Sequence, residues 1–493
     1  MPFSFTWSSF LLLINFLIVV LFSIRVLYTQ RNIGAAIAWI IILFVFPVVG
    51  IVLYLLIGEP RVSKRRLART KKMIKFYDEF AEEYLPSEHF NPDDEIHPTF
   101  RGIERMAEQT TRLGASANNS MKLLSTTDEI LNSMIEDIEQ AQYSCLLAFY
   151  IVEPEGKINK LLEAIKAAAE RGVHCVILAD DVGSGPFLKS EWRTKLEQVG
   201  VFIQTSLPVG LMQTIYGRND LRNHRKILVI DYQIGYTGSF NLIDPVLFRK
   251  DIGIGRWFDV MMRCTGPIVL EMAAVLYADI AVEDDENLQK VKDFLNQQAK
   301  KHNGLTPPTT GGVIAQVIPS APEQEESIIY ETILCAIHLA TKRIVITTPY
   351  FVPNEPLLLA LTTAARKGVD VTLILPRKND SKMVHYASRA YFPLLLKNNV
   401  KIARFDQGML HTKTLVIDDE FSLFGTVNMD MRSFFLNLEI SLAIYDKKIT
   451  KEISQLQQKY LEQSELITPK GWRYRIKLWG LVENIVRLMS PLL

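Results

Sequence analysis

The sequence is short of cysteine and has no excess of either charge. Only four cysteines occur in 493 residues, at wide spacing and with no C-x-x-C pair: Cys145, Cys175, Cys264 and Cys335. This favours buried, reduced thiols on the cytosolic side of a membrane over a disulfide framework or a zinc site. The 55 lysines and arginines nearly balance the 54 aspartates and glutamates. The whole chain is therefore neither a general polyanion binder nor an acidic tail protein.

Charged residues are absent from two long stretches near the N-terminus. Phe3–Ile24 and Ile33–Gly58 contain none, and each reaches the roughly 20 apolar residues that a membrane-spanning helix needs. The first stretch lacks the basic start and the A-x-A-like cleavage site of a secretory signal. We expect residues 1–60 to form two transmembrane helices. A buried hydrophobic hairpin or a re-entrant pair is the alternative.

Basic residues are concentrated directly after the second apolar stretch. Arg61–Lys75 holds eight basic residues and no acidic one, whereas the loop between the stretches holds only Arg25 and Arg31. The positive-inside rule then predicts a multi-pass membrane protein whose large C-terminal part is cytoplasmic and whose short loop is outside. The basic run is either a topology signal alone or also a contact for anionic headgroups.

One polar pattern occurs twice in the chain. A His is followed by Lys at +2, Asp at +7, Gly at +14, a hydroxyl residue at +15 and Asn at +17. The first copy consists of His224, Lys226, Asp231, Ser239 and Asn241, and the second of His411, Lys413, Asp418, Thr426 and Asn428. A lone H-x-K is most often part of an ordinary core strand. Five matched polar positions are different, because burying unpaired charge twice is costly.

The similarity between the two halves extends beyond this pattern. Residues 148–181 and 348–380 each read as an apolar strand ending in an aromatic residue, an amphipathic helix, a basic-Gly-Val turn and a second apolar strand. Alternating strands and helices predict a duplicated α/β domain with a largely buried parallel sheet. The expected divisions after residue 60 are a basic segment and linker (61–108), a first lobe (109–285), a linker (286–312), a second lobe (313–465) and an amphipathic helix (466–493).

The spacing of the repeated pattern indicates its chemistry. Residues two apart on a strand share a face, so each His and Lys point the same way. Asp231 and Asp418 have the opposite parity, and although they belong to the catalytic motif we expect them to be structural. Two half-sites facing one another would offer two imidazoles, two ammonium groups, hydroxyls and amides to one phosphodiester. One imidazole can attack phosphorus while the other transfers protons, without a metal.

Both copies match the H-x-K-x4-D-x6-G-[ST]-x-N signature of the phospholipase D superfamily, which the chain resembles from about residue 110 onward. The resemblance implies two lobes related by a pseudo-two-fold axis, with one active site between them and a covalent phosphohistidine. It implies that His224 is the nucleophile and His411 the acid and base. Ser239, Asn241, Thr426 and Asn428 would bind the phosphate, and the downstream carboxylates Asp259 and Glu439 would orient the histidines.

Further segments are similar to bacterial cardiolipin synthases, namely the paired apolar region, "TPYFVP" from Thr348 and "NMDMRSFFLNLE" from Asn428. That resemblance implies a bacterial cell-membrane enzyme that transfers a phosphatidyl group between two phosphatidylglycerols, giving cardiolipin and glycerol. It implies phosphatidylglycerol, other anionic lipids and the bilayer as partners, with no nucleic acid and no cofactor. The tail from Trp472 resembles an interfacial amphipathic helix, and a helix packed on the second lobe is the alternative.

Three other functions remain open at this point. A phospholipase D hydrolase would use the same residues with water as acceptor and release phosphatidic acid. A nuclease of the same superfamily would need a basic cleft and no bilayer anchor, which the near-neutral charge and the apolar stretches disfavour. A membrane scaffold without enzymatic activity would not depend on His224.

Overall fold

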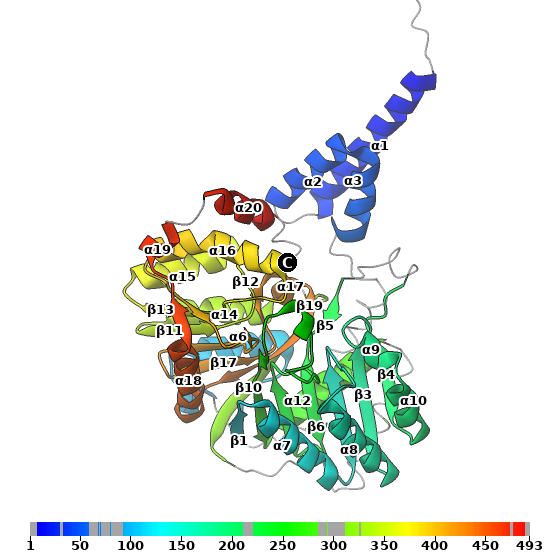
Figure 1. Ribbon diagram of the computed structural model, residues 1–493, viewed down its shortest axis with the longest axis vertical. Helices are drawn as coiled ribbons and strands as arrows, with labels where there is room; N and C mark the ends of the chain where they lie inside the picture. The colour runs from blue at the N-terminus through cyan, green and yellow to red at the C-terminus, as the bar shows by residue number, and fades with distance from the viewer. Residues whose placement is uncertain are drawn as a thin grey trace, which may run out of the picture. The chain divides into compact units, whose positions relative to one another are not determined.

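The chain forms two units, which are described here one at a time. The computed structural model describes residues 7–29, 33–58, 92–210, 220–283, 311–324, 327–473 and 477–488, with a few single residues between these ranges. One unit comprises Met1–Leu67 with Pro208–Leu221, and the other Ala68–Leu207 with Arg222–Leu493. Figure 1 labels the elements. Most of the basic run Arg61–Lys75 and of the predicted linker 286–312 lies outside the described residues.

The first unit contains one helix that can cross a membrane. Helix α1 (Trp7–Thr29) is continuous, and its Leu12–Thr29 part is long and apolar enough to span a bilayer. Its outward side chains are apolar and mostly exposed, as expected of a surface that meets lipid. Within the described residues α1 is the only helix that meets this criterion.

The second apolar stretch folds as a helical hairpin instead of a straight span. Helix α2 (Ile33–Val45) ends at Phe46, where φ is −130° and ψ is 71°, and α3 (Pro47–Leu53) starts at a proline, which has no backbone N–H to continue the first helix. A Cβ on Gly50 would lie 2.9 Å from the carbonyl oxygen of Ile42, so the two helices meet closely. A π-helical turn, η1 (Tyr54–Gly58), returns toward the start of α2.

Contacts within the hairpin show that it doubles back. The Tyr54 ring lies 5.3 Å from that of Trp39, and its hydroxyl lies 2.6 Å from Thr29 Oγ1 at the end of α1. Where the sequence predicted two spanning helices, the described residues therefore contain one helix of spanning length, α1. The 13 residues of α2 reach about 20 Å, which is shorter than the roughly 30 Å hydrocarbon core.

The second unit is built on one 16-stranded sheet that runs through both halves of the sequence. In the first half the strand order is β1-β9-β7-β6-β2-β3-β4, and in the second it is β10-β19-β17-β16-β11-β13-β14, so equivalent strands occupy equivalent places. The halves join where β1 (Ser116–Leu124) pairs antiparallel with β10 (Val313–Ser320). This order has the pseudo-two-fold relation that two phospholipase D-like lobes require.

The sheet is mixed, whereas the sequence pattern predicted a largely parallel one. Among the main strands, only β2 (Ser144–Phe149), β3 (His174–Asp180) and β4 (Phe202–Ser206), with their counterparts β11 (Arg343–Thr347), β13 (Asp370–Pro376) and β14 (Lys401–Phe405), run parallel. The other main strands of each half, among them β9 (Met261–Thr265) and β19 (Asn437–Ile444), pair antiparallel. Three short parallel pairs remain, in which β5 (Arg222–Asn223) pairs with β19, β8 (Trp257–Phe258) with β15 (Met409–Leu410) and β12 (Phe351–Val352) with β18 (Met429–Asp430). Strand β20 (Ser464–Leu466) pairs antiparallel with β14.

Tight hairpins explain the antiparallel strands. β6 (Lys226–Ile230) and β7 (Ile234–Gly238) are joined at Asp231 and Tyr232, and β16 (Thr414–Ile417) and β17 (Phe421–Gly425) at Asp418 and Asp419. All four turn residues have positive φ, between 51° and 59°. Two successive positive φ values are the feature of the turns that connect antiparallel strands. The aspartate of each motif therefore also forms the turn of its hairpin.

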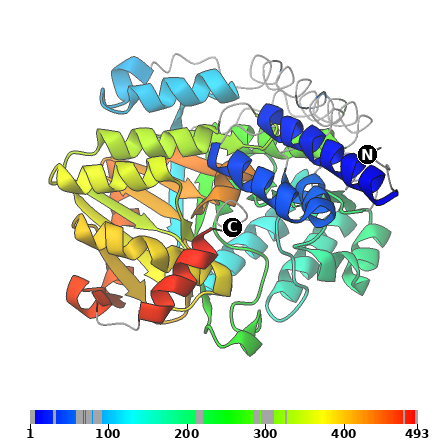
Figure 2. The same cartoon turned by 90° about the horizontal axis from the view of Figure 1, so that it is seen from above.

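Helices pack on both faces of the sheet (Figures 1 and 2). In the first half α7 (Thr127–Gln140) and α8 (Ile158–Glu170) cover one face, and in the second α14 (Ile328–Leu339), α15 (Glu355–Arg366) and α16 (Lys382–Lys397) do so. The other face holds α12 (Ile268–Glu283) and α18 (Lys447–Glu462), which share one apolar core with strands of both halves. The two halves are thus fused through a common core as well as through the sheet.

Candidate active site

Each motif histidine stands where a strand of one half meets a strand of the other. His224 precedes β6, and its backbone N–H donates to the carbonyl of Leu438 in β19 (Asn437–Ile444) at 2.9 Å. His411 precedes β16, and its N–H donates to the carbonyl of Phe258 in β8 (Trp257–Phe258) at 2.9 Å. Short parallel pairs, β5 (Arg222–Asn223) with β19 and β15 (Met409–Leu410) with β8, hold both places. The backbone thereby brings the two motifs to the boundary between the halves.

The predicted orienting carboxylates contact the histidines, and each does so across this boundary. His224 Nδ1 lies 2.9 Å from Glu439 Oε2, and His411 Nδ1 lies 2.7 Å from Asp259 Oδ1. Each carboxylate accepts the Nδ1 proton and leaves the lone pair of Nε2 available for reaction. All four side chains are buried. The sequence indicated the carboxylates, but the unequal spacing gave no sign that each serves the histidine of the other half.

The hydroxyl residues of the motifs bind the carboxylates. Ser239 Oγ donates to Asp259 at 2.6 Å, and Thr426 Oγ1 donates to Glu439. A hydroxyl has a single proton to donate, so neither side chain can give that proton to a phosphate at the same time. The structure therefore places Ser239 and Thr426 behind the carboxylates, in a chain of hydroxyl, carboxylate and imidazole, and not as the phosphate ligands that the sequence led us to expect.

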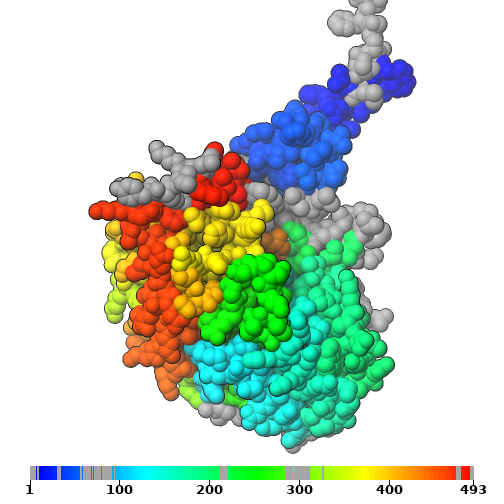
Figure 3. Space-filling view, viewed as in Figure 1, coloured from blue at the N-terminus to red at the C-terminus, as the bar shows by residue number. Residues whose placement is uncertain are grey.

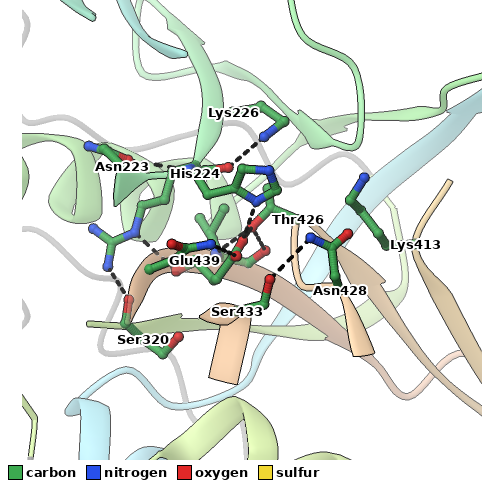
Figure 4. A network of polar contacts seen from close by, with 12 residues as sticks. Asn223, His224, Lys226, Ser320, Lys413, Thr426, Asn428, Ser433 and Glu439 are labelled. Atoms are coloured by element: carbon green, nitrogen blue, oxygen red, sulfur yellow. Dashed lines mark hydrogen bonds and ion pairs between the residues drawn. The ribbon is translucent and has the colours of Figure 1, made fainter. Parts of the chain in front are cut away.

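The two lysines lie in the interior with few partners. Lys226 Nζ donates to the carbonyl of His224 at 2.6 Å, and Lys413 Nζ donates in the same way to that of His411 at 2.6 Å. Burial lowers the pKa of Lys226 to about 8 and, together with the charge of Lys226, lowers that of Lys413 to about 7. Each ammonium keeps protons that can donate to an anionic oxygen. Figure 4 shows side chains of both halves around His224.

The motif asparagines make different contacts. Asn428 Nδ2 donates to Ser433 Oγ at 3.1 Å, while its Oδ1 is buried without a hydrogen-bond partner among the described residues. Asn241 Oδ1 accepts from the backbone N–H of Ile151 at 3.3 Å, which leaves its NH₂ group for a ligand. Both side chains are almost fully buried.

The motif aspartates face away from the histidines. Asp231 accepts from the backbone N–H groups of Gln142, Tyr143 and Ser144 at 2.7–2.8 Å. Asp418 does the same for Thr341, Lys342 and Arg343 at 2.7–2.8 Å. These contacts hold each hairpin turn against the start of the neighbouring strand. The aspartates thus point away from the histidines, as their opposite strand parity predicts. Neither carboxylate touches an imidazole in the described contacts.

Both imidazoles are neutral at physiological pH. Burial lowers the pKa of His224 to about 4 and that of His411 to about 3, and the nearby lysine ammonium groups act in the same direction. Burial alone would raise the pKa values of Asp259 and Glu439, but the histidines and lysines outweigh it and hold both carboxyls below their usual range. The charge of Lys413 reaches His224 and that of Lys226 reaches His411, so the half-sites form one electrostatic unit.

Sequence reasoning missed three neighbours of the histidines. Tyr150 lies edge-on to His224 at 5.1 Å, and Trp257 lies edge-on to His411 at 4.8 Å. Buried Arg225 donates to the carbonyls of Glu439 at 3.0 Å and Ser320 at 2.9 Å, and it pairs with Asp279. The aromatic residue that follows β2 was a visible signal for Tyr150. Nothing in the motif distinguished Arg225, which occupies its variable position.

The arrangement can bind one phosphodiester between two neutral imidazoles and two lysines. Such a set supports nucleophilic attack by one Nε2 and proton transfer by the other, with the ammonium groups stabilising charge on the phosphoryl oxygens. Within the described ranges no three His, Cys, Asp or Glu side chains gather as metal ligands. The fold and the site together define a phospholipase D-like enzyme with one active site built from two halves.

Comparison with known proteins agrees with this class. The family model "Cardiolipin synthase, PLD-like domain" matches residues 134–250 and 333–461, and the model "Phospholipase_D-nuclease N-terminal" matches residues 7–59. The chain is similar to phosphatidylserine synthase of Haemophilus influenzae, with a TM-score of 0.57 and 15% identity over 79% of this chain and 100% of that one. At this identity the likeness concerns the fold alone.

Full-length relatives define the family more closely. Cardiolipin synthase A of Escherichia fergusonii is 37% identical over 99% of both chains. Cardiolipin synthase A of Yersinia pseudotuberculosis is 38% identical over 96% of this chain and 95% of the relative, and that of Klebsiella pneumoniae is 36% identical over the same shares. The chain belongs to the phospholipase D-type cardiolipin synthase family. The resemblance drawn from the two motifs is thereby confirmed.

Proposed function

We propose that the protein is a cardiolipin synthase that transfers a phosphatidyl group from one phosphatidylglycerol to a hydroxyl of another, forming cardiolipin and glycerol. The observation that carries this proposal is the pair of imidazole–carboxylate contacts across the boundary between the halves. They orient two neutral histidines at one site, as a double displacement at phosphorus requires. Membership in the cardiolipin synthase family supports the choice of lipid substrate.

In the first half of the reaction, His224 Nε2 attacks the phosphorus of one phosphatidylglycerol. The P–N bond forms as the P–O bond to the headgroup glycerol breaks, and His411 gives its Nε2 proton to the leaving oxygen. This requires His411 to be protonated when the substrate binds, and the negative phosphodiester raises the pKa of a nearby imidazole. Lys226 and Lys413 hold the phosphoryl oxygens. The assignment of His224 as nucleophile follows the resemblance.

In the second half, the headgroup of another phosphatidylglycerol replaces glycerol. His411, now neutral, takes the proton of its hydroxyl, the oxygen attacks phosphorus, and the P–N bond breaks. Atoms and protons balance, since the proton given to glycerol is recovered from the acceptor. Asp259 stabilises the His411 imidazolium while that proton is held.

We further propose how the chain lies in the bacterial cell membrane. Helix α1 crosses the bilayer, and the hairpin α2–α3 enters and leaves on the cytoplasmic side, which is the re-entrant alternative for the second apolar stretch. The Lys/Arg bias supports this arrangement, because Arg25, Arg31 and Arg61–Lys75 then flank the same face. The catalytic part is cytoplasmic, as the sequence predicted. The short loop is then cytoplasmic as well, in contrast to that prediction.

One incubation tests the function directly. Purified full-length protein is mixed with vesicles of phosphatidylglycerol alone, and the lipids and water-soluble products are identified. We expect cardiolipin and free glycerol in equal amounts. Phosphatidic acid as the main lipid product would show a hydrolase instead, and no product in a preparation that retains its fold would contradict both reactions.

A further inference from the structure

A polar pocket opens in the second half, and none of the residues that line it belongs to the two motifs. Its cavity volume is about 20 Å³, and the space around it reaches about 370 Å³ only when the adjoining open solvent is counted. Three arginines line it and no carboxylate does. Its polar side chains are Arg377, Asn379, His385, Ser388, Arg389 and Arg404. The mechanism above uses none of them.

The fold builds this pocket at one edge of the sheet. It lies at the carboxyl ends of the parallel strands β13 and β14, beside the residues that follow β11. Ligands of open α/β sheets bind beyond this end of the strands. His385, Ser388 and Arg389 are on α16 at positions i, i+3 and i+4, so one face of that helix forms the opposite wall.

The cations of the pocket have donors to spare. Arg404 Nε is buried and has no hydrogen-bond partner among the described residues, while its Nη2 donates to Glu465 at 2.7 Å. Arg377 contacts Asp406 at 2.8 Å and Glu465 at 3.9 Å through one nitrogen. A guanidinium carries five N–H donors, so these contacts leave several free. Burial and the charges of Arg389 and Arg404 lower the pKa of His385 to about 4, against the opposing charge of Glu483.

The element beside the pocket has the character of an interfacial helix. Helix α20 (Lys477–Arg487) packs on α16 through Glu483, which is fully buried and lies 2.9 Å from Arg389. Trp479 stacks on Tyr386 of α16 at 5.6 Å. On its outer side Leu481, Ile485 and Leu488 are 58%, 56% and 78% exposed, at the spacing of one helix face. Figure 1 shows α20 next to α16 and α19 (Pro469–Arg473).

We propose that this pocket binds the phosphate group of an anionic phospholipid headgroup, at a site separate from the two histidines. Arginine forks match phosphate oxygens with two N–H donors each, and Arg404, which lines the pocket, has an unpartnered Nε. The outer apolar face of α20 lies in the headgroup and acyl boundary, and this favours a lipid over free phosphate as the source. The proposal rests on the proposed function only for the membrane setting, and not on the histidine chemistry.

Titration calorimetry with the full-length protein in neutral detergent tests the proposal. The His224→Ala background prevents turnover, and the probe is soluble dihexanoyl-phosphatidylglycerol. We expect two classes of site, the active site and the pocket. Exchanging Lys226 and Lys413 for Met should remove the first class alone. This arm separates a failure of the active site from a failure of the pocket.

Two pocket variants act by different means. Arg377→Gln removes a half-exposed cation and should weaken the second class about fivefold, the change that about 1 kcal/mol produces. Ser388→Asp puts a carboxylate among the arginines and should weaken it at least tenfold. The matched control is Arg193→Gln, which removes a similarly exposed arginine from a carboxylate pair outside the pocket and should change nothing. If Ser388→Asp does not fold, Arg377→Gln carries the test alone.

Two results would overturn the proposal. One is a single class of site that the lysine variants remove and the pocket variants leave intact. The other concerns the ligand: inorganic phosphate that binds the pocket as tightly as the short-chain lipid would reject the lipid assignment. Loss of the second class in both pocket variants, with phosphate at least tenfold weaker than the lipid, would support it.

Discussion

At the scale of residues, the two histidines have different surroundings although their motifs match. Next to His224 stands Arg225, which fixes the backbone of Glu439, whereas the residue after His411 is Thr412, whose hydroxyl lies 3.2 Å from Tyr460. The pKa of His411 is lowered to about 3 and that of His224 to about 4. Both values are lowered, so it is the different neighbours that allow the two imidazoles to take different roles within one pseudo-symmetric site.

The roles of the histidines can be separated by trapping the covalent intermediate. His224→Ala and His411→Ala should each lower turnover by a factor of at least about 10³, because each removes a group that forms a bond or moves a proton. With phosphatidylglycerol labelled in the phosphatidyl group, His411→Ala should retain the label after acid-free denaturation and His224→Ala should not. Label on His224→Ala alone would reverse the assignment of the nucleophile.

The pH dependence of kcat/KM should follow His224 and the two lysines when the substrate is phosphatidyl-p-nitrophenol, whose leaving group departs without a proton from His411. The nucleophile must be neutral, so the rate should fall below about pH 4, the pKa of His224. The pKa of Lys413 is about 7, so its positive charge is present below that pH and lost as the pH rises through it, and kcat/KM should fall above about 7. In Lys413→Arg the charge persists, and the alkaline limb should move to about 8, the pKa of Lys226. An alkaline limb that stays in place would exclude Lys413 as its origin.

Asp231 should matter for stability more than for chemistry. Asp231→Asn removes the negative charge that accepts three backbone N–H groups, and this should cost about 1–3 kcal/mol of unfolding free energy. Chemical denaturation of the detergent-solubilised protein measures the loss, and kcat of the folded fraction should fall less than tenfold. A loss of kcat beyond 10³ with unchanged stability would mean that the carboxylate acts in the reaction.

At the scale of elements, the sequence predicted the strands of the motif but not their partners. The shared face of His and Lys and the outward aspartate follow from the two-residue period of a strand, and the structure has both. The antiparallel pairing depends on positive φ at Tyr232 and Asp419. These residue types do not predict such a turn, whereas an Asn-Gly pair would. The break of the second apolar stretch had a local sign, Pro47, but the length and hydropathy of the stretch concealed it.

Cysteine accessibility tests the proposed hairpin in the membrane. Trp7→Cys lies at the start of α1, Tyr28→Cys at its other end, and Glu95→Cys in the catalytic unit. With an impermeant maleimide on intact cells, we expect only Trp7→Cys to react, and the other two after the membrane is opened. If Tyr28→Cys reacted in intact cells while Glu95→Cys did not, the second stretch would cross the bilayer. Of the native cysteines only Cys335 has to be replaced, since the other three are buried.

At the scale of the whole molecule, the duplication could be predicted from the sequence. The contact of each histidine with a carboxylate of the other half could not. Repeated motifs and helices are local patterns, so one sequence suffices to find them. The pairing of His224 with Glu439, 215 residues away, depends on how the two halves of the sheet join through β1 and β10. The segment 244–256, green in the middle of Figure 3, likewise contacts the second half through Arg249 and Asp380. No spacing in the sequence encodes these contacts.

Because each carboxylate contacts the histidine of the other half, a carboxylate variant in one half should resemble a histidine variant in the other. With phosphatidyl-p-nitrophenol the leaving group departs without a proton, so formation of the intermediate needs only His224 and its partner. Glu439→Gln should slow the burst of p-nitrophenolate about 10²-fold or more, because His224 loses its orienting charge. Asp259→Asn should give a normal burst and then a slow transfer to phosphatidylglycerol, as His411→Ala would. If each carboxylate served the histidine of its own half, the two variants would exchange these behaviours, and the rapid-mixing trace distinguishes the two arrangements in one experiment.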